Sequence, residues 1–541
     1  MNPLQKNRPL AFYFLLIFFL AFLVRVNGID RFPPGLWFDE GLNGVDAWNS
    51  LHGGGLKLVY PDVFPREPML VWLLSIVLFV FGPQVLVMRL LMVLIGSLSC
   101  VFFLAALLGL RRGKSLAFAL CAAFALATLH WHAWFSRLVF RTNLVPLFAC
   151  LALAAMAWAA RRNYSGRSFM GRWLLAGLVI GAGFYTYLAW YFFLPVILVW
   201  LWALHDNEDN PFNWPLLGFK FLHIAIGALI IAFPLGLHYA MHPEHLAGRP
   251  QAVSPFQDGW WAGLLLILEN LRDVLLMFSI RGDHVALHNV AEIVGPDSPR
   301  FGKTGTPVLD PAWSLFFYVG LAAAIVRVFR KKREWRQCIA WLVWLLCMSL
   351  PSVFSQTDSA NTLRNLGVTP AVAWMVAYGF QQLRAFARRF QQPWRRVVNI
   401  LLLALLIWGA GFQVYKLLVR HPAVPGIADR FNAINVHLAE LTEADPEGAP
   451  LFVADMFRNK TFEFMTIGRD DIRTYDFDAV RQAQESPPRD HRVLCTIYDD
   501  HFRRLKSLFP DAYVEEDKLY MGDRPFAWVL RIPASSLQKA E

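Results

Sequence analysis

The sequence predicts an α-helical protein that crosses a membrane many times and carries a small α/β domain at its C-terminal end. Three observations lead to this prediction: long apolar runs, basic clusters between them, and a change of residue pattern near position 420. Of the 541 residues, 56% are hydrophobic and 15% are aromatic. Several runs can cross a hydrocarbon core of about 30 Å, so we expect a multi-pass protein of the cell membrane, inner or plasma, surrounded by membrane lipids.

Eleven apolar segments are predicted to span the membrane, which gives about eleven transmembrane helices. They are residues 10–26, 84–110, 115–135, 142–160, 173–188, 190–204, 220–238, 311–329, 337–354, 368–384 and 397–419. Two further apolar segments are expected not to cross. Residues 69–82 are too short for a full crossing. Residues 259–280 carry charged side chains in mid-run, and each costs about 2.5 kcal/mol or more at the bilayer centre.

Lysine and arginine gather in short clusters that all fall on one side of this arrangement. The clusters are residues 111–114, 161–172, 327–336 and 384–396. The positive-inside rule places them in the cytoplasm together with the N-terminus, which carries Lys6 and Arg8. The first apolar run lacks a small-residue cleavage site and is expected to remain as an anchor. The clusters also explain the formal net charge of +11, so no nucleic-acid partner is predicted.

The C-terminal residues have a different pattern from the rest of the chain. The runs "APLFVADMF", "RVLCTIYDD" and "AWVLRIPA" read as strands between turns and helix-like pieces. We therefore expect a membrane domain at 1–419, with outer loops at 27–83 and 239–310, and an extracytoplasmic α/β domain at 420–541. Five of the six cysteines lie in apolar runs and no CxxC pair occurs, so no disulfide, thiolate metal site or cofactor is predicted.

The stretch "WFDEGLNGVDAWNSL", residues 37–51, places two adjacent acids soon after the first predicted crossing. On a helix this stretch has one apolar and one polar face, and such a helix is expected to lie in the membrane surface. Asp39 and Glu40 would occupy its first turn, where the macrodipole and free backbone N–H groups favour carboxylates. By pattern alone, capping explains the two acids as well as a catalytic role does.

A second charged pair, Arg66 and Glu67, precedes Pro68 and a short apolar segment, which "FGPQVLVMRLLMVLIG" follows. Together with the acidic pair, this order resembles the first outer loop of the GT-C glycosyltransferases. The resemblance is greatest to the protein O-mannosyltransferase-like family and the lipid A aminoarabinose transferases. It continues through "HWHAWFSRLVFRTNLVPLF", "GAGFYTYLAWYFFLP" and "DSANTLRNLGVTPAVAW", and covers roughly residues 10–385.

The resemblance implies an enzyme that takes a sugar from a polyprenyl-phosphate donor on the outer face of the membrane. The sugar would pass with inversion to an acceptor that the sequence does not name, which could be a protein, a lipid or a cell-envelope glycan. Asp39 matches the catalytic Asp of the family, and a carboxylate can accept the proton of an attacking hydroxyl. Glu40 leaves a helix in another direction and is expected to orient a substrate or to cap the helix.

The departing phosphate needs fixed cations, and four arginines on the predicted outer side are candidates: Arg66, Arg137, Arg141 and Arg364. Relatives hold the carrier phosphate in the last outer loop, which here contains Arg364. A Lys precedes the corresponding Pro in the aminoarabinose transferases, whereas Glu67 stands here, so either Arg66 or Glu67 could contact the phosphate or the sugar. Each arginine could instead extend its side chain to lipid headgroups.

Tyr187 completes the predicted site, because its region borders the carrier cavity in the family. His130 and His132 are two residues apart and face opposite ways on a helix, so no metal site is predicted. Two other functions stay open. A transporter or flippase of lipid-linked glycans would need charged groups at mid-membrane, and the predicted crossings carry almost none. A membrane-anchored receptor would use the two acids only as caps.

Overall fold

The computed structural model describes most of the chain: residues 3–110, 116–161, 167–205, 213–291, 305–332, 334–356, 360–441, 449–454, 459–475, 489–496, 501–521 and 524–538. The basic cluster predicted at 111–114 lies outside these residues, as do 292–304 of the long outer loop. The chain divides into two compact units. The first comprises Met1–Asp30, Gly55–Leu73 and Met88–Ile427, and the second comprises Arg31–Gly54, Leu74–Val87 and Ala428–Glu541.

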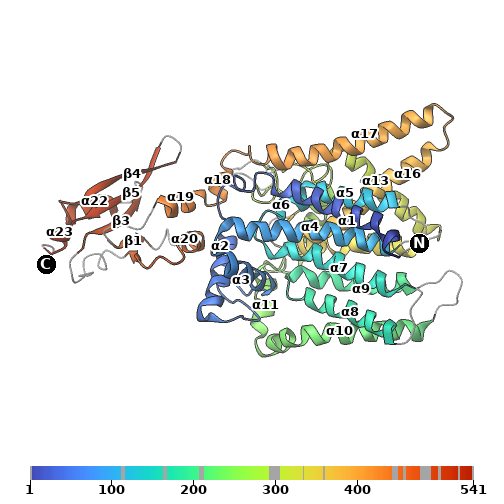
Figure 1. The fold of residues 1–541 in the computed structure, drawn as a ribbon, viewed down its shortest axis with the longest axis horizontal. Coiled ribbons are helices and arrows are strands. Elements are labelled where there is room, and N and C mark those ends of the chain that lie inside the picture. The colour runs from blue at the N-terminus through green and yellow to red at the C-terminus, as the bar shows by residue number, and fades with distance from the viewer. Residues whose placement is uncertain are drawn as a thin grey trace. The chain divides into compact units, whose positions relative to one another are not determined.

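Helices make up most of the described chain before residue 442. In order they are α1 (Pro3–Val26), α2 (Phe38–Asn49), α3 (Met69–Phe81), α4 (Val85–Gly109), α5 (Leu116–Thr128), α6 (His130–Phe135), η2 (Arg141–Asn143), α7 (Leu144–Ala159), α8 (Arg167–Gly183), η3 (Leu188–Phe193), α9 (Leu194–His205), α10 (Trp214–Met241), α11 (Pro243–Ala252), α12 (Trp260–Leu276), α13 (Pro311–Phe329), α14 (Trp335–Cys347), α15 (Leu350–Val353), η5 (Leu366–Val368), α16 (Thr369–Ala387), α17 (Trp394–Tyr415), η6 (Lys416–Arg420), α18 (Ile427–Arg430) and α19 (Ala433–Leu441). Figure 1 shows α7 to α10 running side by side in the first unit.

Seven described segments are long and apolar enough to cross a membrane, which agrees with a multi-pass membrane protein. They are Val85–Gly109, Arg141–Ala159, Leu188–His205, Trp214–Met241, Pro311–Phe329, Trp335–Val353 and Trp394–Arg420. Shorter apolar helices at Leu10–Val26, Leu116–Thr128 and Ser168–Gly183 coincide with three more predicted crossings. Met69–Phe81 is also a short apolar helix. The count of eleven crossings therefore remains a prediction.

Two predicted helices are interrupted in the structure. The segment predicted at 115–135 breaks at Leu129, whose extended backbone separates α5 from α6. The segment predicted at 173–188 already ends as a helix at Gly183, because Tyr187 is extended and begins the 3₁₀ turn η3. Apolar composition does not report such breaks, since a broken and a continuous helix bury the same residue types.

Glycine lets several helix backbones come into direct contact. A Cβ atom at Gly177 or Gly181 of α8 would lie 2.9 Å from the Cα atom of Ile224 or Ala228 of α10, respectively. A Cβ atom at Gly320 of α13 would lie 2.9 Å from the backbone nitrogen of Gly379 of α16. Small residues are expected at such contacts, because helices in lipid associate through close packing.

The C-terminal part of the second unit is the small α/β domain that the sequence predicts. Its elements are β1 (Leu451–Ala454), α20 (Lys460–Met465), β2 (Ile472–Tyr475), β3 (His491–Thr496), α22 (His501–Leu508), β4 (Tyr513–Met521), β5 (Arg524–Ile532) and α23 (Ala534–Gln538) (Figure 1). The strands form one sheet in the order β2-β1-β3-β5-β4. β1 pairs in parallel with β2 and β3, whereas β5 is antiparallel to β3 and β4.

Alternation along β1 explains why both faces of this sheet are covered. Leu451 and Val453 point to one face, where they belong to the buried cluster that contains Phe462 of α20. Phe452 points to the other face and belongs to the cluster that contains Leu505 of α22. Successive side chains of a strand point to opposite faces, so each face can carry its own helices.

Candidate functional site

Asp39 lies in the first turn of α2, as predicted, and is partly buried. Glu40, next to it, is fully buried, and its carboxylate accepts a hydrogen bond from the backbone N–H of Trp37 at 3.0 Å. This bond satisfies one of the amide groups that the start of a helix leaves unpaired. Of the two roles expected for Glu40, the structure therefore supports capping.

The polar face of α2 is largely buried in the protein, whereas a helix lying in the membrane surface would leave that face open to water. Asn43 is only 2% exposed and Asp46 only 6% exposed. Two contacts within the second unit hold the helix: Gly41 meets the backbone of α20, and the hydroxyl of Ser75 in α3 donates to the carbonyl oxygen of Ala47 at 3.1 Å. The amphipathic pattern of α2 therefore serves packing against protein.

Glu67 holds three segments of the first unit together. Its carboxylate forms an ion pair with Arg141, at the start of η2. It also accepts a hydrogen bond from the backbone N–H of Leu188, the first residue of η3. Both side chains are largely buried, and burial raises the pKa of Glu67 while Arg141 acts against this rise. The predicted residues Glu67 and Arg141 therefore meet, and Glu67 binds a protein cation.

Tyr187 lies at the centre of a group of arginines. The guanidinium of Arg141 lies over its ring, 5.7 Å from the centroid. The positive charges of Arg364, Arg141 and Arg249 act on the Tyr187 phenol, and the negative charge of Glu67 acts against them. The structure thus brings together three predicted residues, Tyr187, Arg141 and Arg364, and adds Arg249.

Arg249 is the member of this group that sequence analysis missed. It lies in α11, and its guanidinium is 4.8 Å from the ring centroid of Phe64, the ring that Arg141 also approaches at 5.8 Å. The signal available in the sequence was an arginine beside a proline in a predicted outer loop. Arg141, Arg249 and Arg364 all act on Tyr187 with positive charge, which Glu67 offsets in part, and guanidinium groups suit a phosphate group.

Arg66 and Arg137 are placed differently from the other two predicted arginines. Arg66 pairs through its backbone with Tyr60, in an antiparallel bridge with N to O distances of 3.0 and 2.9 Å, and its side chain is buried. Arg137 donates from its guanidinium to the carbonyl oxygens of Asn27 and Gly28, at 2.8 and 2.9 Å. Arg137 therefore fastens the end of α1, and burial lowers its pKa to about 10.

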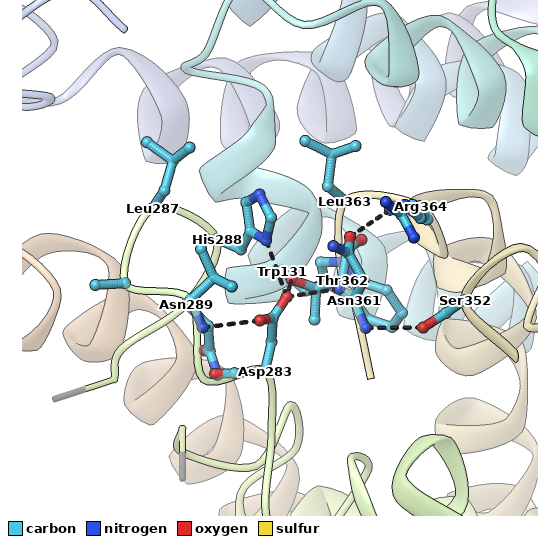
Figure 2. A network of polar contacts seen from close by, with 12 residues as sticks. Trp131, Asp283, Leu287, His288, Asn289, Ser352, Asn361, Thr362, Leu363 and Arg364 are labelled. Atoms are coloured by element: carbon cyan, nitrogen blue, oxygen red, sulfur yellow. Dashed lines mark hydrogen bonds and ion pairs between the residues drawn. The ribbon is translucent and has the colours of Figure 1, made fainter. Parts of the chain in front are cut away.

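Arg364 stands on a loop that runs from residue 361 into the first turn of η5, and side chains of several elements hold the backbone of this loop (Figure 2). The indole N–H groups of Trp131 in α6 and Trp344 in α14 each donate to a loop carbonyl oxygen at 2.8 Å. The hydroxyl of Thr142 in η2 donates to a third loop carbonyl at 2.9 Å. A loop fixed in this way needs little ordering when a ligand binds to it.

A buried carboxylate, Asp283, completes the support of this loop and was also missed by sequence analysis. It is 0% exposed, and its Oδ2 atom accepts from both the backbone N–H and the hydroxyl of Thr362, each at 2.7 Å. His288 lies 3.1 Å away through its Nδ1 atom (Figure 2). Burial alone would raise the pKa of Asp283, but His288 and the backbone donors outweigh it, so this pKa lies below its ordinary value.

The two histidines considered for a metal site have separate partners. His130 Nε2 lies 3.3 Å from His421 Nδ1, whereas His132 Nδ1 lies 2.6 Å from a guanidinium nitrogen of Arg25. Because His421 Nε2 lies 2.8 Å from the carbonyl oxygen of Ala286, Nε2 carries its proton and Nδ1 accepts from His130. Among the described residues, no group of three or more His, Cys, Asp or Glu side chains has a geometry that could hold a metal ion.

The fold is that of the GT-C membrane glycosyltransferases, because the chain is similar over nearly its whole length to solved structures of this class. The crystal structure of ArnT from Cupriavidus metallidurans in the apo state has a TM-score of 0.55 at 13% identity, covering 98% of this chain and 99% of that chain. ArnT bound to undecaprenyl phosphate has a TM-score of 0.52 at 14% identity, with the same coverage.

A second similar structure is the archaeal oligosaccharyltransferase AglB from Archaeoglobus fulgidus, in complex with an inhibitory peptide and a dolichol-phosphate. Its TM-score is 0.52 at 14% identity, covering 86% of this chain and 64% of that chain. No family model and no curated protein sequence matches the chain. The likeness is thus one of fold, and it agrees with the resemblance found in the sequence.

Proposed function

We propose that the protein transfers a sugar from a polyprenyl-phosphate donor to an acceptor on the outer face of the membrane, with inversion. The observation that carries the proposal is the arginine group around Tyr187, found in a chain with the GT-C fold. Structures with this fold include one bound to undecaprenyl phosphate and one in complex with a dolichol-phosphate. Both ligands are phosphates carried by a polyprenyl chain, which is the class of carrier proposed here.

The arginine group supports binding of the donor phosphate. As the sugar departs, negative charge grows on the phosphate oxygens, and fixed cations stabilise that charge. Guanidinium groups can donate two parallel hydrogen bonds to one phosphate. We assign the main contact to Arg364, because its loop is held by hydrogen bonds from several elements. Arg141 and Arg249 would add charge beside it.

Asp39 is assigned the role of general base. The acceptor hydroxyl attacks the anomeric carbon from the side opposite the phosphate, and its proton passes to the Asp39 carboxylate. The new bond joins the acceptor oxygen to the sugar, while the bond between sugar and phosphate oxygen breaks and its electrons leave with the phosphate. The first-turn position supports an ionised Asp39, since the helix dipole favours a negative charge there.

Two measurements test this function. Deletion of the protein in its host should remove one sugar from a surface glycan, lipid or protein, as seen by mass analysis. The purified protein in detergent should bind undecaprenyl phosphate or dolichol phosphate. When envelope material from the deletion strain supplies the acceptor hydroxyl, the protein should transfer the sugar from a synthetic polyprenyl-phosphate sugar that matches the missing sugar, and free carrier should be released. Unchanged surface glycans together with no binding of either carrier would contradict the proposal.

A further inference from the structure

The residues on both sides of Asp39 are held by the C-terminal part of the second unit. Before Asp39, Gly35 lies against the backbone of residues 431–433. After Asp39, Gly41 lies against the backbone of α20 at Lys460. The partly buried carboxylate therefore belongs to a short segment whose two ends are fixed by residues about 400 positions later in the chain.

Glycine is required at both ends, because the backbones touch. A Cβ atom at Gly41 would lie 2.5 Å from the carbonyl oxygen of Lys460 and 2.8 Å from the backbone nitrogen of Thr461. A Cβ atom at Gly35 would collide with the carbonyl oxygen of Phe431 and would lie 2.7 Å from the backbone nitrogen of Ala433. Backbone atoms cannot move aside as a flexible side chain can.

Thr461 adds a directed bond to this contact. Its hydroxyl donates to the carbonyl oxygen of Leu36 at 2.8 Å and accepts from the Nδ2 atom of Asn432 at 3.2 Å. The side chain is 0% exposed, so water cannot replace either bond. Leu36 comes three residues before Asp39 and just before the start of α2. The bond therefore sets where the chain enters the helix that carries Asp39.

We propose that the C-terminal domain is a positioning element for the general base, with Thr461 as its main positioning residue. The proposal rests on the proposed function, because it takes Asp39 as the base. A general base works only within hydrogen-bond reach of the proton it accepts. A displacement of about 1 Å can cost on the order of a hundredfold in rate. The domain would thus act on the rate of the chemical step through Leu36 and Gly41.

The first test compares two threonines of the C-terminal domain. Thr461→Val keeps the side-chain shape and removes the hydroxyl, whereas Thr461→Ser keeps the hydroxyl. Thr466→Val is the matched control, because the Thr466 hydroxyl donates only within α20, to the carbonyl oxygen of Phe462 at 2.9 Å. We expect Thr461→Val to lower kcat about tenfold or more, with the affinity for undecaprenyl phosphate unchanged. Thr461→Ser should retain most of kcat, and Thr466→Val should leave it unchanged.

The second test separates positioning from stability with a double-mutant cycle. If Thr461 acts through Asp39, Thr461→Val should lower turnover in the wild-type background and have little further effect in the Asp39→Asn background. Thermal unfolding of all variants shows whether the protein stays folded. Gly41→Ala should reproduce the loss of kcat, whereas Gly218→Ala, at a glycine with open space around it, should not.

The outcomes distinguish this inference from the proposed function. Normal kcat in Thr461→Val, or equal loss in both backgrounds, would overturn the positioning role while leaving Asp39 as the base. Normal turnover in Asp39→Asn would overturn the assignment of the base itself. A fall in carrier affinity equal to the fall in kcat would assign Thr461 to general folding and would also overturn the inference.

Discussion

The loop that carries Arg364 and the segment that carries Asp39 are fixed in two different ways. The loop lies in the first unit, where side chains from α6, α14, η2 and the segment around Asp283 bind its backbone. The segment lies in the second unit, where glycines bring its backbone against that of the C-terminal domain. The first support consists of many separate hydrogen bonds, whereas the second combines close backbone contact at two glycines with one hydrogen bond from Thr461.

Because the two regions are held differently, amino-acid substitutions should affect them differently. A loop held by several hydrogen bonds should lose them one at a time, so single substitutions should have graded effects. A segment held by backbone contact tolerates no added atom at the contact, so one methyl group should have a large effect. The proposed phosphate site and the proposed base thus have separate means of support, which substitutions can separate.

The largest expected effect is the loss of turnover when the proposed general base, Asp39, is replaced. Asp39→Asn should lower turnover by about 10² to 10⁴, the usual contribution of general-base catalysis, while the affinity for undecaprenyl phosphate stays close to that of the wild type. Glu40→Gln is the control: its side-chain oxygen can still accept from Trp37, so it should lose much less. A more damaged Glu40→Gln would reverse the roles of the two acids.

On the phosphate side, Arg364→Ala should weaken binding of undecaprenyl phosphate. Loss of a cation from a partly desolvated phosphate costs about 1.5–3 kcal/mol, which is roughly tenfold to more than a hundredfold in affinity. Arg364→Lys should restore only part of it, since Lys cannot form the two parallel bonds. Titration calorimetry in detergent gives the affinities. An Ala variant that binds the carrier normally would remove Arg364 from the phosphate site.

A smaller loss of carrier affinity is expected when a hydrogen bond that holds the Arg364 loop is removed. Asp283→Asn should lower carrier affinity about two- to tenfold, because ordering a loop costs about 0.5–1.5 kcal/mol per side chain. Asp310→Asn is the matched control: Asp310 is also a buried carboxylate, but it caps α13 through the N–H groups of Ala312 and Trp313. Both variants should unfold at lower temperature, and only Asp283→Asn should bind the carrier more weakly.

The lowered pKa of Asp283 also predicts that the stability of the protein depends on pH. The pKa of Asp283 is lowered in the folded protein, so its contribution to the free energy of unfolding is complete above the unfolded pKa of about 3.9. It is lost as the pH falls through the folded pKa. The difference in unfolding temperature between wild type and Asp283→Asn should therefore narrow only as the pH falls below about 4, between the unfolded and the folded pKa. A constant difference would show that the charge of Asp283 does not matter.

The smallest effect is expected at Tyr187. Tyr187→Phe keeps the ring under Arg141 and removes only the hydroxyl, so carrier affinity should change by less than about fivefold. Tyr187→Ala also removes the ring and should weaken binding further. If Tyr187→Phe bound the carrier as weakly as Tyr187→Ala does, the phenol oxygen would itself be a ligand of the phosphate.

Sequence analysis could predict the parts of this protein that depend on local pattern. The position of Asp39 follows from helix-start chemistry, and the α/β domain follows from alternation in short runs. The burial of Asn43 and Asp46 could not be predicted, because periodicity defines the faces of a helix but not what covers them. The place of Glu40 in the first turn of a predicted helix is enough to predict its capping role.

Pairings between distant residues account for most of what the sequence could not predict. Glu67 and Arg141 were both candidates, but nothing local indicates that they bind each other across 74 positions. Asp283 and Thr362 are 79 positions apart, and an isolated Asp in a loop carries no sign of its partner. Such pairs are set by how the helices assemble, which residue types alone do not determine.

The glycine contact between α8 and α10 restricts the routes open to a lipid. At Gly177 and Gly181 the backbones of the two helices touch, with no side chain between them. A prenyl tail is about as thick as a leucine side chain, and no space of that width exists at this level. An isoprenoid chain therefore cannot pass from the bilayer between α8 and α10 at the level of these two glycines.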